Sequence, residues 1–336
     1  MAGVDEPVVC VIPGDLHLTD EGERNDRDLC RVIEEVNHLI RPDFVQFIGD
    51  NVQNATDAQF SLFNERRSRL NVPHFCLVGD HDVERDPEAE GFRRHVGETY
   101  GSTSLRGYRF IRLNTQEFRP LGLSEAQIDW FEREVADAES AGERVVIFQH
   151  NYPYQIWEDY QGAGIDKWRA IVQTRRIEGI LCGHTHYWQI ANDGRNAFVA
   201  TRSIGDPEGG PAGYTILHLQ GDDIAVTFRA LNQRTPIVLV THPTDRLMAT
   251  DSRHIVRAAD RIAVRVWHDA KIEQVRCRVD DGEWESMTPS GSGDWSRPIH
   301  ADSLSKGIHS VEALAFGVGG EVGTGRIEFI VDPTGR

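Results

Sequence analysis

The chain has 336 residues, which is enough for a sizeable core and for two domains. Asp and Glu number 53 against 36 Lys and Arg, so the formal net charge is −17. Such a surface repels nucleic acids and anionic membranes, and no apolar run has the length of a membrane span. We therefore expect neither a nucleic-acid polymer nor a membrane as a partner.

The N-terminus and the cysteines bear on the compartment. Met-Ala-Gly-Val-Asp-Glu lacks the basic start and the long apolar stretch of a signal peptide. The five cysteines are scattered and show no metal-ligand spacing. These features predict a cytoplasmic protein with reduced, mostly buried thiols.

Short apolar runs alternate with helical patterns over the first two-thirds of the chain. Runs that are short, mostly rich in β-branched or aromatic residues and bounded by Gly, Pro or Asp occur at residues 8–12, 44–48, 75–78, 145–148 and 177–181. They predict buried strands. Residues 26–40 place apolar side chains near one helical face, and Ser124 with Gln127 predicts a capping box at the start of another helix. This alternation indicates a layered α/β core.

The pattern changes after Thr235-Pro236, where helical periodicity fades. Strand-like runs follow at residues 237–240, 262–267, 275–279, 311–316 and 327–331. Asp280-Asp281-Gly282 predicts a hairpin turn, and several short strands with turn signals indicate a small β-sandwich. We therefore expect an α/β domain at residues 1–233 and an all-β domain of immunoglobulin- or fibronectin-like type at residues 234–336.

Motifs that combine Gly, Asp and His follow the predicted strands of the first domain. In chain order they are Gly14-Asp15-Leu16-His17, Gly49-Asp50-Asn51, Gly79-Asp80-His81-Asp82, Gln149-His150 and Gly183-His184-Thr185-His186. Each motif alone is weak, because a Gly-Asp pair is usually a turn or a helix cap. However, the carboxyl ends of strands line the ligand crevice in layered α/β folds, so all of them could converge. Carboxylate and imidazole together suit Mn, Fe or Zn.

The order of these motifs resembles that of the calcineurin-like metallophosphoesterase family, over residues 8–230. Closest in style are the bacterial class III cyclic-nucleotide and glycerophosphodiester phosphodiesterases. The resemblance implies a two-sheet α/β sandwich with helices outside and a centre of two divalent metal ions. It implies one metal bound by Asp15, His17, Asp50 and His186, and a second bound by Asp50, Asp80, His150 and His184. Asp50 would bridge the two ions, and His81 would act as the acid or charge stabiliser beside the leaving group.

Two positions depart from the family pattern. Asp80 stands where the family usually has Asn, and Gln53 stands where the second motif usually ends in Asp. The first change alters the charge of an expected ligand and so affects metal preference and rate. The second change is expected to affect residues that contact the metal ligands rather than the ligands themselves.

The substrate is weakly encoded in the sequence. Tyr152 and Tyr154, shortly after His150, could stack on a base or pack against a headgroup, or could simply pack between a loop and the core. Arg202 could bind a phosphate, although a salt bridge is the commoner role of a single Arg.

The expected reaction is hydrolysis of a small phosphate ester, preferably a diester, by a water that two metals roughly 3.5–4 Å apart activate. The alternatives are a phosphomonoesterase and a non-catalytic scaffold on the same core. The β-domain could cover the site, support a homo-oligomer or bind a partner.

Overall fold

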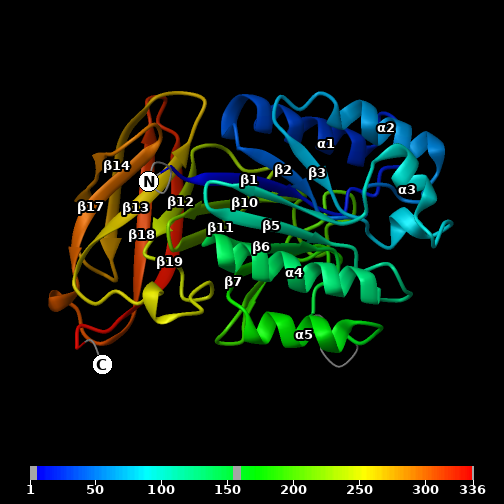
Figure 1. The fold of residues 1–336 in the computed structure, drawn as a ribbon. Helices are drawn as coiled ribbons and strands as arrows, with labels where there is room; N and C mark the ends of the chain where they lie inside the picture. The colour runs from blue at the N-terminus through cyan, green and yellow to red at the C-terminus, as the bar shows by residue number, and fades with distance from the viewer. Residues whose placement is uncertain (1–5, 154–159, 335–336) are drawn as a thin grey trace.

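The computed structural model describes residues 6–153 and 160–334. Figure 1 shows two sheets packed face to face, with α1 to α3 outside one of them and α4 and α5 outside the other. A separate body of strands stands at one end of this α/β core. The expected fold class, a two-sheet α/β sandwich followed by an all-β region, is confirmed.

The first sheet has the strand order β11-β10-β1-β2-β3. Its strands are β1 (Val8–Pro13), β2 (Phe44–Phe47), β3 (His74–Cys76), β10 (Gly213–Gln220) and β11 (Asp223–Ala230). β1, β2 and β3 are parallel, whereas β10 is antiparallel to β1. The parallel strands therefore deliver their carboxyl ends to one edge of the sheet.

The second sheet has the order β4-β5-β6-β7-β9-β8. Its strands are β4 (Gly101–Leu105), β5 (Tyr108–Leu113), β6 (Arg144–Gln149), β7 (Ile177–Cys182), β8 (Gln189–Asn192) and β9 (Ala197–Ala200). The central strands β5, β6, β7 and β9 are parallel. The sequence pattern did not identify β4, β5 or β8 to β11, because several of these strands mix polar and apolar residues on half-covered faces.

The helices cover the outer faces of the two sheets. They are α1 (Arg24–Glu35), which continues into a π-helical turn (Val36–Ile40), α2 (Asp57–Arg67), α3 (Glu90–His95), α4 (Glu125–Ala141) and α5 (Ile165–Thr174). None of the helices in the described part of the chain is both long and apolar enough to cross a bilayer.

Strand β1 shows how period-2 alternation builds two cores at once. Val9 and Val11 face the cluster under α1 and α2, whereas Val8, Cys10 and Ile12 face the cluster between the sheets. Both faces are buried, which explains why this strand reads as a continuous apolar run.

Of the two hydrogen bonds expected in the capping box of α4, one is present. The Ser124 side chain accepts a hydrogen bond from the Gln127 backbone N–H, as predicted. The Gln127 side chain does not return to Ser124 but donates to the Asn114 carbonyl and to Glu117. Glu117 instead accepts the Ser124 N–H, so a residue from the preceding loop replaces the second arm of the box.

The C-terminal region consists of two four-stranded antiparallel sheets, β12-β13-β17-β16 and β15-β14-β18-β19. The bounds are β12 (Ile237–His242), β13 (Ala259–Trp267), β14 (Ile272–Val279), β15 (Glu285–Ser286), β16 (Thr288–Pro289), β17 (Asp294–His300), β18 (Gly307–Gly317) and β19 (Val322–Val331). The hairpin predicted at Asp280-Asp281-Gly282 joins β14 to β15. The boundary between residues 233 and 234 stays a prediction; it falls just before β12.

β12 joins the β-sandwich to the α/β core. Its side chains alternate: Val238 and Val240 belong to the core of the sandwich, whereas Ile237 and Leu239 belong to the cluster under α1 and α2. Trp267 from β13 adds to that second cluster. We call this contact the seam. Because one strand contributes to two cores, the sandwich is fixed to the core by apolar burial.

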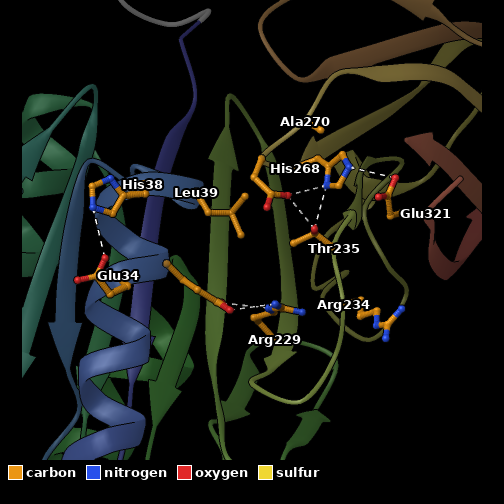
Figure 2. A pocket seen from close by; sticks show the side chains of 11 residues that line it. Glu34, His38, Leu39, Arg229, Arg234, Thr235, His268, Ala270 and Glu321 are labelled. Carbon is orange, nitrogen blue, oxygen red and sulfur yellow. Dashed lines mark hydrogen bonds and ion pairs between the residues drawn. The ribbon is translucent and has the colours of Figure 1, made fainter. Parts of the chain in front are cut away.

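A half-buried ion-pair cluster also lies at the seam. His242 Nδ1 is 2.8 Å from Asp223 Oδ1 of β11, and its Nε2 is 3.0 Å from Asp260 Oδ1 of β13. Burial alone would lower the pKa of His242, but the two carboxylates outweigh it and raise the pKa to about 9. At the other end of β12, residues of α1 and of the loop before β12 line a groove of about 660 Å³. His268 donates or accepts a hydrogen bond with Thr235 there, as Figure 2 shows.

Candidate metal centre

The Asp- and His-containing motifs converge on one site, as the sequence predicts. They follow β1, β2, β3, β6 and β7, whose carboxyl ends meet between the two sheets. Backbone hydrogen bonds tie the loops together: the His17 N–H donates to the Asp50 carbonyl, and the Gly183 N–H donates to the His150 carbonyl. The ligand loops therefore support one another.

The converging side chains form two groups that share Asp50. Within each group the candidate ligand atoms all lie within 4.8 Å of one another. The members of the first group are Asp15, His17, Asp50 and His186, and those of the second are Asp50, Asp80, His150 and His184. The structure thus brings together all the residues that the sequence assigned to the two metals.

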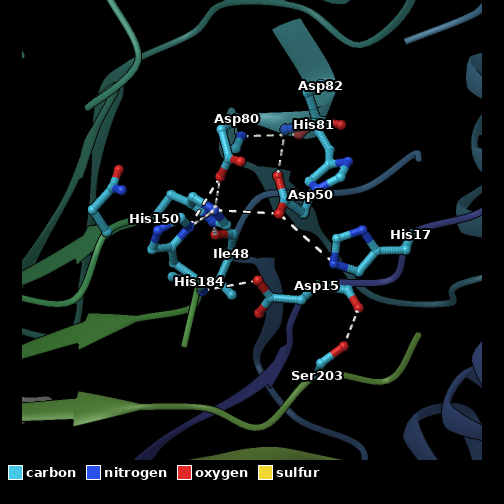
Figure 3. Close-up of polar contacts among 12 residues, drawn as sticks. Asp15, His17, Ile48, Asp50, Asp80, His81, Asp82, His150, His184 and Ser203 are labelled. Carbon is cyan, nitrogen blue, oxygen red and sulfur yellow. Dashed lines mark hydrogen bonds and ion pairs between the residues drawn. The ribbon is translucent and has the colours of Figure 1, made fainter. Parts of the chain in front are cut away.

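Short contacts within the groups match the spacing of atoms around an ion. Nε2 of His17 is 3.1 Å from Nε2 of His186, and Asp80 Oδ1 is 3.0 Å from both His150 Nε2 and His184 Nδ1. Ligand atoms about 2.0–2.2 Å from one ion lie about 3–3.5 Å apart at tetrahedral or octahedral angles. Figure 3 shows the side chains of His17, Asp80 and His150 pointing toward a common centre.

The backbone of the ligand loops is held in a conformation that L-residues rarely adopt. Residues at positive φ include Asp15 (49°), His17 (47°), Asp50 (50°), His184 (71°) and His186 (60°). A left-handed conformation costs a non-glycine residue on the order of 1–2 kcal/mol. Such strain persists only where the surroundings enforce it, and it concentrates at functional sites.

The glycines before the ligands leave room for side chains of neighbouring loops. A Cβ on Gly49 would lie 2.4 Å from His150 Nδ1, and a Cβ on Gly79 would lie 2.1 Å from Asp50 Oδ1. A Cβ on Gly183 would lie 2.7 Å from Asp15 Oδ2. Each glycine is therefore required by the ligand packed against it.

The first group is buried and contains polar atoms that protein contacts do not satisfy. Asp15 is fully buried, and among the described residues neither its Oδ2 nor the Nδ1 of His17 has a hydrogen-bond partner. Burial raises the pKa of Asp15 to about 8 and lowers the pKa of His17 to about 4. His17 is thus a neutral imidazole, the form that binds metals. A cation at this position would satisfy the free oxygen of Asp15 and favour the ionised carboxylate.

The second group is oriented by a backbone carbonyl. His150 Nδ1 lies 2.9 Å from the carbonyl oxygen of Ile48, which can only accept, so Nδ1 carries a proton and Nε2 faces the site. Burial would raise the pKa of Asp80, but hydrogen bonds from His150 and His184 hold it well below its usual range. Asp80 is therefore ionised and turned into the centre. The donor set of both groups, carboxylate plus imidazole, fits Mn, Fe or Zn.

His81 lies beside the two groups. Its backbone N–H donates to Asp50 Oδ1 at 2.9 Å, and its ring is 4.6 Å from the ring of His17. Nδ1 of His81 is 2.9 Å from the Gln53 carbonyl, so this nitrogen donates and Nε2 is left for other contacts. Burial lowers the pKa of His81, but the Gln53 carbonyl and the nearby carboxylates raise it above its ordinary value.

Asp82 and Asn51 were parts of the motifs to which the sequence gave no role. Asp82 is buried and accepts hydrogen bonds from the backbone N–H groups of Gly79, Asn51 and Val52. Its second oxygen also accepts from the Asn51 amide, which in turn donates to the Leu77 carbonyl. This network fixes the loop after β3 against the loop after β2.

Sequence reasoning missed two charged residues at the rim. Arg119, from the loop between β5 and α4, donates to the Asp80 carbonyl at 3.3 Å. Asp206 Oδ2 lies 4.0 Å from His186 Nδ1. Neither position stands in a recognisable motif. Only the folded chain brings these loops to the metal ligands.

The three expected substrate contacts have different outcomes. Tyr152 is buried within the cluster under α4 and α5, which favours the packing role over a contact with substrate. Tyr154 lies outside the described residues. The Arg202 guanidinium lies 5.5 Å from the centre of the Phe228 ring and against Gly210. Its Nε and Nη1 have no hydrogen-bond partner within residues 6–153 and 160–334.

The family model for calcineurin-like phosphoesterases matches residues 10–188 of this chain. The chain belongs to this family. A second family description, the C-terminal region of calcineurin-like phosphoesterases, matches residues 179–311 and so reaches into the β-sandwich. The predicted family resemblance is confirmed.

Two curated relatives and one solved structure show the range of similarity. A probable glycerophosphodiester phosphodiesterase, GpdQ, of Arcobacter nitrofigilis is 26% identical over 204 residues, covering 53% of this chain and 72% of the relative. The 3',5'-cyclic adenosine monophosphate phosphodiesterase CpdA of Escherichia coli K12 is 28% identical over 167 residues, covering 46% of this chain and 59% of CpdA. A dimetal phosphatase from Danio rerio shares the fold with a TM-score of 0.53 and 12% identity, covering 66% of this chain and 96% of that one.

Proposed function

We propose that the protein hydrolyses small phosphodiesters, with two divalent metal ions held by the two ligand groups that share Asp50. The observation that carries this proposal is the pair of groups itself, each with its ligand atoms within 4.8 Å. When bound, such ions polarise phosphoryl oxygens and lower the pKa of water. Asp50 is the bridge in this proposal because it belongs to both groups.

The roles of the surrounding side chains follow from their positions. His81 presents Nε2 beside the ligands while Gln53 holds Nδ1, so a proton on Nε2 could pass to the oxygen of the leaving group. Arg119, anchored at the Asp80 carbonyl, carries a positive charge at the rim. That charge would favour an anionic ester over a neutral one.

A preference for diesters rests on two lines of support. Both curated relatives are named as phosphodiesterases. In addition, three carboxylates, from Asp15, Asp50 and Asp80, face the centre and partly cancel the charge of two divalent ions. A diester carries one negative charge and a monoester carries up to two, so the additional carboxylate disfavours the monoester more strongly.

The test is a metal analysis of the purified chain combined with turnover of bis-p-nitrophenyl phosphate and p-nitrophenyl phosphate. We expect two divalent ions per chain and a higher kcat/KM for the diester. A higher kcat/KM for the monoester would assign the protein to the phosphomonoesterases. Bound metal without turnover of either ester would favour the scaffold alternative, and absence of metal would contradict the proposal as a whole.

A further inference from the structure

A small pocket lies between β3 of the first sheet and β5 of the second. β3 is an edge strand of the first sheet, and β5 is next to β4, an edge strand of the second. The pocket has a volume of about 180 Å³. Its lining includes Arg67, His74, Cys76, Tyr100 and Arg112, none of which belongs to the two metal-ligand groups.

The two arginines of this pocket lack carboxylate partners. Arg67 donates to the Asn64 side chain and to the Val96 carbonyl, and its Nη1 is 3.7 Å from the Cys76 sulfur. Within the described residues, the Arg112 guanidinium donates hydrogen bonds to the Thr103 hydroxyl alone. Among the described residues neither guanidinium makes an ion pair, although acidic residues outnumber basic ones in this chain.

Aromatic rings hold both guanidinium groups in place. The Arg112 guanidinium lies 4.4 Å from the centre of the Phe75 ring, and that of Arg67 lies 5.5 Å from the centre of the Phe63 ring. Burial lowers the pKa of Arg112 to about 10, which reflects a cation without a compensating charge. The group stays protonated at neutral pH and is preorganised for an anion.

The other lining groups allow an oxyanion to bind. His74, half-buried on β3, has Nδ1 3.4 Å from the Val72 carbonyl, which leaves Nε2 for a ligand. Burial raises the pKa of the Cys76 thiol to about 12, so the thiol is neutral and adds no negative charge. Glu98 is the carboxylate of the lining, and it is exposed at the rim.

We propose that this pocket is a binding site for a small oxyanion of phosphate size, separate from the metal centre. Arg67 and Arg112 would each donate N–H groups to its oxygens, as guanidinium groups do in phosphate sites. One water accounts for roughly 30 Å³ of liquid, so the pocket has room for an ion of about five heavy atoms.

The experiment is equilibrium dialysis of the full-length protein against radiolabelled inorganic phosphate, in the wild type and in Asp50→Asn. The second background separates this pocket from phosphate held at the metal centre. We expect Arg112→Met to remove one phosphate per chain in both backgrounds, and Arg67→Met to weaken the same component at least about tenfold. Arg109→Met is the matched control, since Arg109 lies on the same strand but is paired with Glu134 and Glu143.

The outcomes are separable from those of the proposed function. Phosphate binding that is identical in the wild type, Arg112→Met and Arg67→Met would overturn the proposal, whatever the phosphoesterase activity. An equal loss in Arg109→Met would overturn it as well, because the effect would then reflect net charge. Circular dichroism identifies a variant that fails to fold, in which case the other arginine variant decides.

Discussion

The metal centre and the seam are both buried contacts between distant parts of the chain, but different forces hold them. At the metal centre, ionisable side chains and left-handed backbone converge, and without cations these groups repel or strain one another. At the seam, Ile237 and Leu239 bury apolar surface, and His242 forms ion pairs with one carboxylate from each side. The seam therefore stabilises the fold, whereas the metal centre keeps strained and charged groups in place for a ligand.

The largest effect is expected from Asp50→Asn, which keeps the shape of the shared side chain and removes its charge. We expect kcat for a diester to fall at least about 10³-fold, because both ion sites lose a charged ligand. The fold should be retained, since no residue of the seam changes. Steady-state kinetics and metal analysis measure these effects.

The matched control for Asp50→Asn is Asp57→Asn, which removes an exposed carboxylate paired with Arg94. Exposed pairs contribute little, so activity should be unchanged. Two bound metals with full turnover in Asp50→Asn would remove Asp50 from the bridging position.

The next effect concerns His81→Ala. If His81 protonates the leaving group, the loss should reach about 10²- to 10³-fold on alkyl esters and be much smaller on nitrophenyl esters, which need no proton. A series of esters with graded leaving-group pKa measures the difference. Equal losses across the series would mean that His81 only positions the substrate.

At the seam, Leu239→Ala should lower the free energy of unfolding by about 2–5 kcal/mol, because it leaves a cavity in the apolar cluster that β12 shares with the α/β core. Metal content should not change, which would separate the two regions. Chemical denaturation followed by fluorescence provides the measurement. The exposed Leu247→Ala is the control, and an equal effect there would show that Leu239 has no special part in the seam.

The ion-pair cluster predicts a pH dependence of stability. The pKa of His242 is raised to about 9 in the folded protein, above the unfolded value of about 6.5. Its contribution, at most about 3 kcal/mol, is therefore complete below pH 6.5 and is lost as the pH rises through 9. His242→Gln should flatten the wild-type decline in unfolding free energy between pH 6.5 and 9. An unchanged decline in that variant would assign the effect to other groups.

The smallest effect is expected from Asp80→Asn. Removing one of three carboxylates should improve monoester turnover relative to diester turnover by a few-fold, about 1 kcal/mol, because the centre becomes more positive. Both esters should be measured on the same metal-loaded preparation. Unchanged selectivity would mean that the charge of Asp80 does not act on the substrate.

The sequence predicted the parts of the molecule in which local pattern and structure coincide. β1, β2, β6 and β7 are short, mostly apolar runs, and the Asp and His residues that follow them are recognisable by their order. β10 was missed because Thr215 and His218 interrupt its apolar pattern, although both are buried. The contact of Arg119 with the Asp80 carbonyl depends on how loops far apart in the sequence pack. Glu117, the partner of Gln127, lies in the loop before α4 but stands in no recognisable capping motif.

The glycines of the ligand loops have a consequence for how this chain could change during evolution. At Gly49, Gly79 and Gly183 the space of a single methyl group is already taken by an atom of a neighbouring ligand or loop. An alanine at any of them would leave all the ligands in the sequence and yet displace one of them in space. A descendant of this chain could therefore lose activity through substitution of one glycine, although all its Asp and His ligands are kept. A comparison of sequences that considers only the Asp and His ligands would then classify an inactive protein as an enzyme.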